Sequence, residues 1–378
     1  MKALTTKFQV QATPPLKVWQ SLKKCLPSPN NKDVEFWWRL TGYHLAVMID
    51  AAGYSTEKQY ETLFFHYHWI AQRQSLDGRP VFKSLIAYDG SPLEYSWKWN
   101  TIGGEPDIRY SWEAINDTSG TAVDPLNHDP TLEYMEKVPS VLPGTDFIWY
   151  RHFLAELYNP DRSVYAKELE QGDPPATTLM HAVEYNKNTS FGLKSYFLPR
   201  KLFQGGDPAT FFKSVREIMA MGGLRDVSES SLQDLRSLIL TVLGLPGDYP
   251  EDAEIPVEAN GGNAWPDFEA LCEGFVYFFD IAPTSSKPDV KFYLTTRKYG
   301  ADDTTIVRNL VAWIYAHGCG AYCDAYLGML EKLAKHRGLK NGKGMHAYIN
   351  YQCTEKGEPD VKSYISPELY HRARYAAV

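Results

Sequence analysis

The chain has 378 residues, 44% of them hydrophobic and 22% charged, which is the composition of a globular protein with one large domain or two ordinary ones. Its net charge of −7 at pH 7 argues against nucleic acid and anionic membranes as partners. No run of about 18 apolar residues occurs, so no membrane-spanning helix is expected.

Taken in chain order, two helix-like stretches precede two strand-like stretches, and this succession occurs four times. The expected helices are 36–52 and 56–75, 132–138 and 146–157, 208–220 and 230–243, and 304–317 and 322–336. The expected first strands lie within 84–99, 180–185, 274–281 and 344–352, and the second strands at 106–111, 191–196, 288–293 and 359–364. Residues rich in Gly, Pro, Asn and Ser separate the strands of each pair, so each pair is expected to form a hairpin.

A short pattern recurs in the second strand of every pair. An aliphatic residue is followed by a cation, which is Arg109, Lys194, Lys291 or Lys362 in turn, and three of the four copies carry Tyr two positions later. Cation and Tyr share one face of a strand, because side chains alternate with period two. The preceding helices must cover the other, apolar face, so the cations point into a closed barrel. Buried cations call for an anionic ligand or water. The alternative is an open sheet with solvated Lys side chains.

The order and spacing of several stretches resemble the fungal dimethylallyl-tryptophan-synthase-type aromatic prenyltransferases. The matching stretches are Leu85-Ile86 with 92–96, 108–110, 193–199, 288–293 with 299–303, 346–349 and 364–367. The resemblance implies an α+β fold, a barrel of ααββ units with antiparallel strands inside and helices outside. It also implies transfer of a dimethylallyl or longer prenyl group from its diphosphate to an indole or phenol. Dimethylallyl diphosphate would be the co-substrate, with no metal or other cofactor.

The resemblance also assigns roles to residues. Glu94 matches the catalytic carboxylate that accepts the N–H or O–H proton of the aromatic acceptor, and Leu85 and Ile86 match the acceptor site. Diphosphate contacts are implied for Arg109, Lys194 and Lys291. Strand alternation adds Lys362 and Gln352 as inward-pointing candidates. The tyrosine shield around the prenyl chain is expected at Tyr196, Tyr293, Tyr348 and Tyr364.

The chain departs from the family pattern in one place. The family has five ααββ units and this sequence has four, because 198–201 leads almost directly into 214–219. The absent unit would carry an Arg-x-Lys-x-Tyr strand, which occurs nowhere in the chain. Three functions therefore stay open: an aromatic prenyltransferase; a cyclase or other acid–base enzyme on the same scaffold, acting through Glu94; and an inactive binding paralogue.

The remaining expectations concern the whole protein. Residues 1–16 lack an apolar signal core, so a cytoplasmic protein is expected, with all 378 residues in one domain, as a monomer or homodimer. The five Cys are interpreted as reduced structural thiols. His66 and His68 are interpreted as packing or surface histidines rather than metal ligands. Residues 371–374 are expected to form a solvated tail. The 25 Tyr and 10 Trp indicate either an aromatic-rich core or a binding cavity walled by rings.

Overall fold

The computed structural model of the chain describes residues 16–29, 31–71, 82, 84–87, 89–100, 104–172, 177–187, 191–198, 200, 228–256, 276–280, 289–353 and 359–375. Eight antiparallel strands form one sheet in the order β4-β3-β2-β1-β8-β7-β6-β5. The strands are β1 (Leu93–Trp99), β2 (Asp107–Trp112), β3 (Leu179–Tyr185), β4 (Gly192–Phe197), β5 (Val276–Asp280), β6 (Asp289–Leu294), β7 (His346–Cys353) and β8 (Pro359–Ile365).

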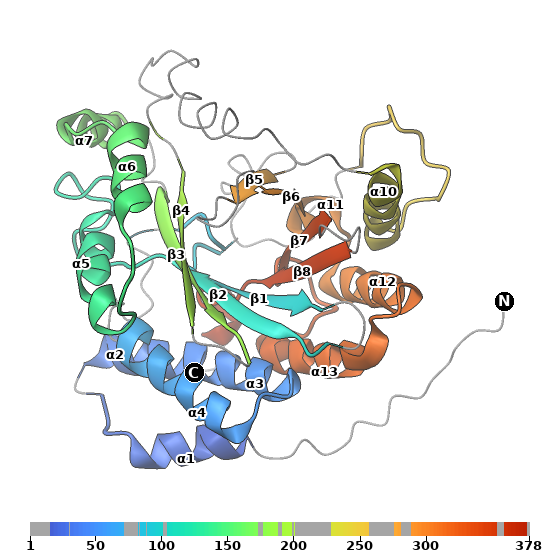
Figure 1. Ribbon diagram of the computed structural model, residues 1–378, viewed down its shortest axis with the longest axis horizontal. Helices are drawn as coiled ribbons and strands as arrows, with labels where there is room; N and C mark the ends of the chain where they lie inside the picture. Colours follow the sequence, from blue (N-terminus) through green and yellow to red (C-terminus); the bar gives the residue numbers. More distant parts are fainter. Residues whose placement is uncertain are drawn as a thin grey trace.

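The helices lie around the outside of the curled sheet (Figure 1). They are α1 (Lys17–Cys25), α2 (Lys32–Trp37), α3 (Tyr43–Ala51), α4 (Thr56–Phe65), α5 (Asp129–Lys137), α6 (Ile148–Leu157), α7 (Ser163–Glu170), α10 (Glu229–Leu243), α11 (Thr296–Tyr299), α12 (Asp303–Ala316) and α13 (Cys323–Leu333). Local signals set several of their ends. Ser55, Ser228 and Asp302 accept a backbone hydrogen bond at the starts of α4, α10 and α12. Gly244, with φ +70°, ends α10.

The outer face of the sheet packs on the helices through aromatic rings. Trp97 and Trp99 of β1 lie 5.2 and 4.7 Å from Tyr326 of α13, measured between ring centroids. The Tyr95 hydroxyl donates to the Thr41 carbonyl at 3.0 Å, so the odd-numbered side chains of β1 face the helices. The aromatic-rich core that the composition suggested is thus confirmed. By alternation, the even-numbered side chains of β1 point to the opposite side, which we call the inner face.

The four hairpins and the helices that precede them are confirmed for the described part of the chain. The expected helix 208–220 lies outside the described residues. Three helices are found that the sequence patterns did not predict: α1, α7 and α11. The prediction for the two histidines holds, because His66 is buried against Thr41 and Tyr110 and His68 is exposed. Cys25, Cys319 and Cys323 are free thiols, as expected.

The eight strands found among the described residues agree with four units, and β4 and β5 stand at the two ends of the sheet that they form. Within the described ranges these two strands are not paired with each other. The stretch of chain that connects them, 198–275, contains the place where the sequence analysis expects one unit to be absent. The sheet therefore ends on both sides of the position that an additional hairpin would take.

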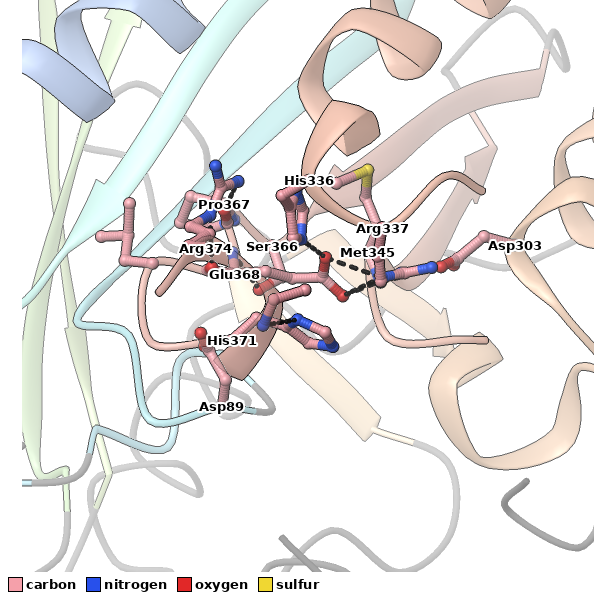
Figure 2. Close-up of polar contacts among 12 residues, drawn as sticks. Asp89, Asp303, His336, Arg337, Met345, Ser366, Pro367, Glu368, His371 and Arg374 are labelled. Carbon is pink, nitrogen blue, oxygen red and sulfur yellow. Dashed lines mark hydrogen bonds and ion pairs between the residues drawn. The ribbon is translucent and has the colours of Figure 1, made fainter. Parts of the chain in front are cut away.

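The C-terminal segment is held by a buried ionic cluster, so the expectation of a solvated tail at 371–374 is wrong (Figure 2). Arg374 donates to the backbone carbonyls of Pro367 and Glu368, each at 2.7 Å. The Glu368 carboxylate accepts from Arg337 Nε at 2.9 Å and contacts His336 Nε2 at 2.7 Å. Arg337 is also paired with Asp303. Charges this well paired can be buried, which fixes the segment in place.

This C-terminal segment packs against the residues that lead into β1. The backbone N–H groups of Leu369 and Tyr370 donate to Ser91 Oγ and Asp89 Oδ2, at 3.0 and 2.8 Å. Glu94 lies three residues beyond Ser91. The cluster therefore supports the end of the barrel at which Glu94 lies.

Candidate active site

Glu94 lies near the start of β1, on the inner face. It is 7% exposed, and within the described part of the structure its Oε1 atom has no hydrogen-bond partner. Burial raises its pKa to about 8, and the positive charge of Arg297 opposes the rise. A buried carboxyl oxygen with nothing to bind is ready for a ligand that carries a hydrogen-bond donor.

Leu85 and Ile86 lie in the loop before β1, and a second buried carboxylate supports this loop. Glu113 accepts from the hydroxyls of Ser84 and Thr177, each at 2.7 Å, and the Leu85 N–H donates to Thr177 Oγ1 at 2.7 Å. Burial raises the pKa of Glu113 to about 7, although these hydrogen bonds lower it. Unlike Glu94, Glu113 has its oxygens occupied, so it acts here as an anchor for the loop.

The four tyrosines expected to form a shield come from four strands and gather in one cluster. The hydroxyl oxygens of Tyr293 and Tyr364 are 3.1 Å apart, and the rings of Tyr293 and Tyr348 are 6.3 Å apart. Tyr196 joins through its hydroxyl, which lies 3.5 Å from a guanidinium nitrogen of Arg109. The structure thus brings the predicted tyrosines together on the inner face.

The predicted cations lie on the same face, but carboxylates accompany them. Glu184 of β3 is paired with Arg109, and its Oε1 lies 3.4 Å from the Lys194 ammonium. Asp360 of β8 lies 3.5 Å from Lys362 and 3.3 Å from Lys98.

The last two predicted contacts lie beside this group. Lys291 is 7% exposed and close enough to lower the pKa of both Asp360 and Lys362. Gln352 is half-buried on β7, with its Cα opposite that of Asp360. The predicted diphosphate contacts therefore gather around two acidic side chains.

Lys362 differs from an ordinary surface lysine. Burial lowers its pKa to about 7, Asp360 raises it, and the charges of Arg109, Lys291 and Lys98 lower it further. Near neutral pH its ammonium group is thus close to losing a proton. An anion bound beside Lys362 would favour the charged ammonium form and so raise its pKa.

The inner face is arranged in levels along the strands. Glu94 and Lys98 are four residues apart on β1, so their Cα atoms are about 13 Å apart. Between them lies Ser96, whose Cα is paired with that of Tyr364 on β8. Along β1 and β8, Glu94 is therefore followed by Tyr364 and then by the paired Lys98 and Lys362, whereas Arg109 of β2 is paired with Ser96 and lies at the level of Tyr364.

Four residues of this region escaped the sequence reasoning: Lys98, Glu184, Asp360 and Arg297. Alternation alone could have placed Lys98 on the same strand face as Glu94, since the two are four residues apart. Glu184 lies in the predicted strand 180–185, but the sequence did not show which cations it would meet. Arg297 follows β6 in the short helix α11. It is 1% exposed, with its guanidinium 4.6 Å from the centre of the Tyr348 ring and a hydrogen bond to the Tyr348 hydroxyl. No sequence pattern indicated that this arginine folds back onto the site.

No group of three or more His, Cys, Asp and Glu side chains in the described ranges is arranged to hold a metal ion. Among the helices whose residues are described, none is long and apolar enough to cross a membrane.

Comparison with known protein families gives one match, to the family described as tryptophan dimethylallyltransferase. It covers residues 33–209 and 205–329, in two stretches that meet at 205–209. Among solved structures, NotF in complex with brevianamide F and DMSPP has a TM-score of 0.69 at 17% identity, covering 93% of this chain and 99% of NotF. AnaPT from Neosartorya fischeri has the same TM-score and identity, covering 93% of this chain and 98% of AnaPT. These likenesses establish the fold.

Curated relatives are more similar in sequence. Prenyltransferase anuH of Penicillium roqueforti is 40% identical over 431 positions, covering 96% of this chain and 95% of the relative. Xanthone prenyltransferases B and A of Emericella nidulans are 34% and 35% identical, covering 95% and 94% of this chain and 92% and 96% of the relatives. Because the chain has 378 residues, at least 53 positions of the anuH alignment (431 minus 378) lie opposite a gap in it.

Proposed function

The chain belongs to the tryptophan dimethylallyltransferase family and is an aromatic prenyltransferase, and we propose that it prenylates a hydroxylated aromatic ring. Two relatives at 34–35% identity are named for xanthones, an oxygenated aromatic ring system. The observation that carries the proposal is the Glu94 carboxyl, buried on the inner face with one oxygen unoccupied in the described structure. A phenol O–H is a suitable donor for that oxygen.

In the proposed reaction, the bond between C1 of the prenyl group and its diphosphate oxygen breaks, and the diphosphate leaves with the electron pair. Glu94 accepts the phenol proton, so that electron density on the ring rises as a ring carbon attacks the allylic cation. The ring carbon then loses its proton to the departing diphosphate, and Glu94 returns the first proton to the oxygen. With its pKa raised to about 8, Glu94 is a stronger base than an exposed carboxylate once it has lost its own proton, so the base form becomes more populated as the pH rises toward 8.

The tyrosine cluster suits the allylic cation. Aromatic faces attract a cation through their quadrupole, and four packed rings keep away water that would convert the cation into an alcohol. We assign this role to Tyr196, Tyr293, Tyr348 and Tyr364. The diphosphate would be held by Arg109, Lys194, Lys291 and Lys362, with Gln352 beside them. Charge neutralisation by these side chains would need no metal ion.

We also propose that this chain lacks one ααββ unit between β4 and β5. Three observations support this: the family match divides at 205–209, the anuH alignment contains at least 53 unmatched positions, and β4 and β5 are the end strands of the sheet. The absent unit would have added two cations. Charge-assisted hydrogen bonds are worth about 1.5–3 kcal/mol each, so diphosphate binding is expected to be weaker than in a five-unit relative.

The activity is tested by incubating the protein with dimethylallyl diphosphate and a panel of xanthones, simple phenols and indoles. Prenylated phenols with equimolar diphosphate release are expected, and Glu94→Gln should slow their formation by about 10²–10⁴. Products formed from indoles alone would refute the proposed acceptor class. Absence of product and of diphosphate release would refute the activity in this chain.

The proposed loss is tested separately, by inserting one ααββ unit taken from anuH at residues 205–209. The insertion is expected to tighten diphosphate binding by about 100-fold or more, since it restores two charge-assisted contacts. Unchanged affinity in a folded chimera would refute the proposed loss.

A further inference from the structure

Two acidic side chains on the inner face, Glu184 and Asp360, are each shared between two cations. Glu184 is paired with Arg109 on one side and Lys194 on the other, and Asp360 with Lys98 and Lys362. The proposed function assigns no role to either carboxylate. Three of the four cations are nevertheless those expected to hold the diphosphate.

Backbone pairing fixes the position of Glu184. Its Cα lies directly opposite that of Arg109 on β2 and that of Gly192 on β4. Gly192 has no side chain, and a methyl group built there would lie 3.3 Å from Glu184 Oε2. The Glu184 side chain therefore lies over the neighbouring strand, in the direction of Lys194.

These side chains are only partly exposed to water, with 22% of Glu184 and 11% of Arg109 accessible. Burial disfavours the charged form of Glu184, but the charges of Arg109 and Lys194 outweigh it and lower its pKa. At neutral pH the carboxylate is thus ionised and occupies the guanidinium and ammonium groups. An anion that contacts both cations has to lie beside this carboxylate, where like charges repel.

We propose that Glu184 competes with the prenyl diphosphate for Arg109 and Lys194, and so limits how tightly the site holds diphosphate. The inference rests on the proposed function, because it takes these two cations as diphosphate contacts. Without a competing carboxylate, the cations would hold the product diphosphate, which carries more charge than its ester, and slow its release. Glu184 returns to them as the diphosphate leaves.

The test is Glu184→Gln, which keeps the size of the side chain and removes its charge. Binding of inorganic diphosphate is measured by titration calorimetry, without acceptor, so that no chemical step enters the result. The dissociation constant is expected to fall at least tenfold. In steady-state assays, KM for dimethylallyl diphosphate and kcat are both expected to fall, because tighter binding slows release of the product.

Two variants serve as controls. Glu105→Gln removes an equivalent carboxylate that pairs with Lys187 at 2.6 Å, outside the site and largely exposed, and should leave diphosphate affinity unchanged. Glu184→Asp keeps the charge and should remain close to wild type. If Glu184→Gln folds poorly by circular dichroism, Glu184→Ala takes its place, with the same expected direction.

The outcomes separate the two proposals. If Arg109→Gln loses diphosphate binding but Glu184→Gln leaves the affinity unchanged or weakens it, the competition is refuted and the site stands. A weakened affinity would mean that Glu184 only holds the cations in position. If the wild-type protein binds no inorganic diphosphate, the proposed site and the competition are both refuted.

Discussion

Replacing Glu94 with Gln should have opposite effects on activity and on stability. The variant keeps the shape of the side chain but cannot accept a proton from the acceptor, so kcat is expected to fall by about 10²–10⁴. The same change removes a buried ionisable group, whose Oε1 has no partner in the described residues. The folded protein is therefore expected to become more stable.

The size of the stability gain follows from the pKa of Glu94, raised from 4.5 to about 8. Between these two pH values the folded protein keeps a proton that the unfolded chain has lost. The wild-type free energy of unfolding therefore decreases as pH rises, by about 1.4 kcal/mol per pH unit from this group. At pH 7 the cost is about 3 kcal/mol, and Glu94→Gln should recover it.

The assay is urea denaturation of both proteins at pH 4.5, 6, 7 and 8. Their stabilities should be similar at pH 4.5 and diverge up to pH 8. Glu105→Gln serves as the control, because Lys187 lowers the pKa of this exposed carboxyl and no such gain is expected. A stability difference that stays flat from pH 4.5 to 8 would refute the burial argument. A variant with wild-type kcat would refute the role of Glu94 as a base.

Three further predictions concern the diphosphate contacts, the tyrosine cluster and the buried ionic cluster near the C-terminus. Affinity for inorganic diphosphate should fall as pH rises above about 7, because Lys362 then loses its proton. Lys362→Arg stays charged and should remove most of that fall, measured in a titration series from pH 6 to 9. Tyr293→Ala should raise the ratio of prenyl alcohol to prenylated product several-fold by admitting water. Tyr293→Phe keeps the ring and gives up the hydroxyl that contacts Tyr364, so it should stay near wild type; chromatography of both products measures the ratio. Arg337→Met leaves Glu368 buried without its guanidinium partner and should lower the free energy of unfolding by about 3–5 kcal/mol in urea, and a loss below about 1 kcal/mol would contradict the account of the cluster.

Much of the site was predictable because the positions of its cations follow from the alternation of side chains along the strands. Alternation with period two placed Arg109, Lys194, Lys291 and Lys362 on one face, and the helices before each hairpin required the other face to be apolar. The same reasoning gave the four hairpins and the eight strands. The proposed absence of one unit between β4 and β5 also began as a prediction from the sequence, because 198–201 leads almost directly into 214–219.

Local patterns could not show how the cations are neutralised or how the ends of the barrel are supported. Glu184 and Asp360 meet their cations across strand pairs, and Arg297 reaches Tyr348 from a different element. The C-terminal segment looked like a solvated tail because its charges match Glu368 and neighbouring carbonyls only after the chain has folded.

The sequence by itself determined the four hairpins, their faces and the family, because these follow from periodicity and from motifs in a fixed order. The tertiary structure alone decided which charges meet. It leaves one oxygen of Glu94 unoccupied in the described part, while Glu113, which is also buried, has both of its oxygens bonded. That difference depends on contacts between residues distant in the chain, which no local pattern specifies.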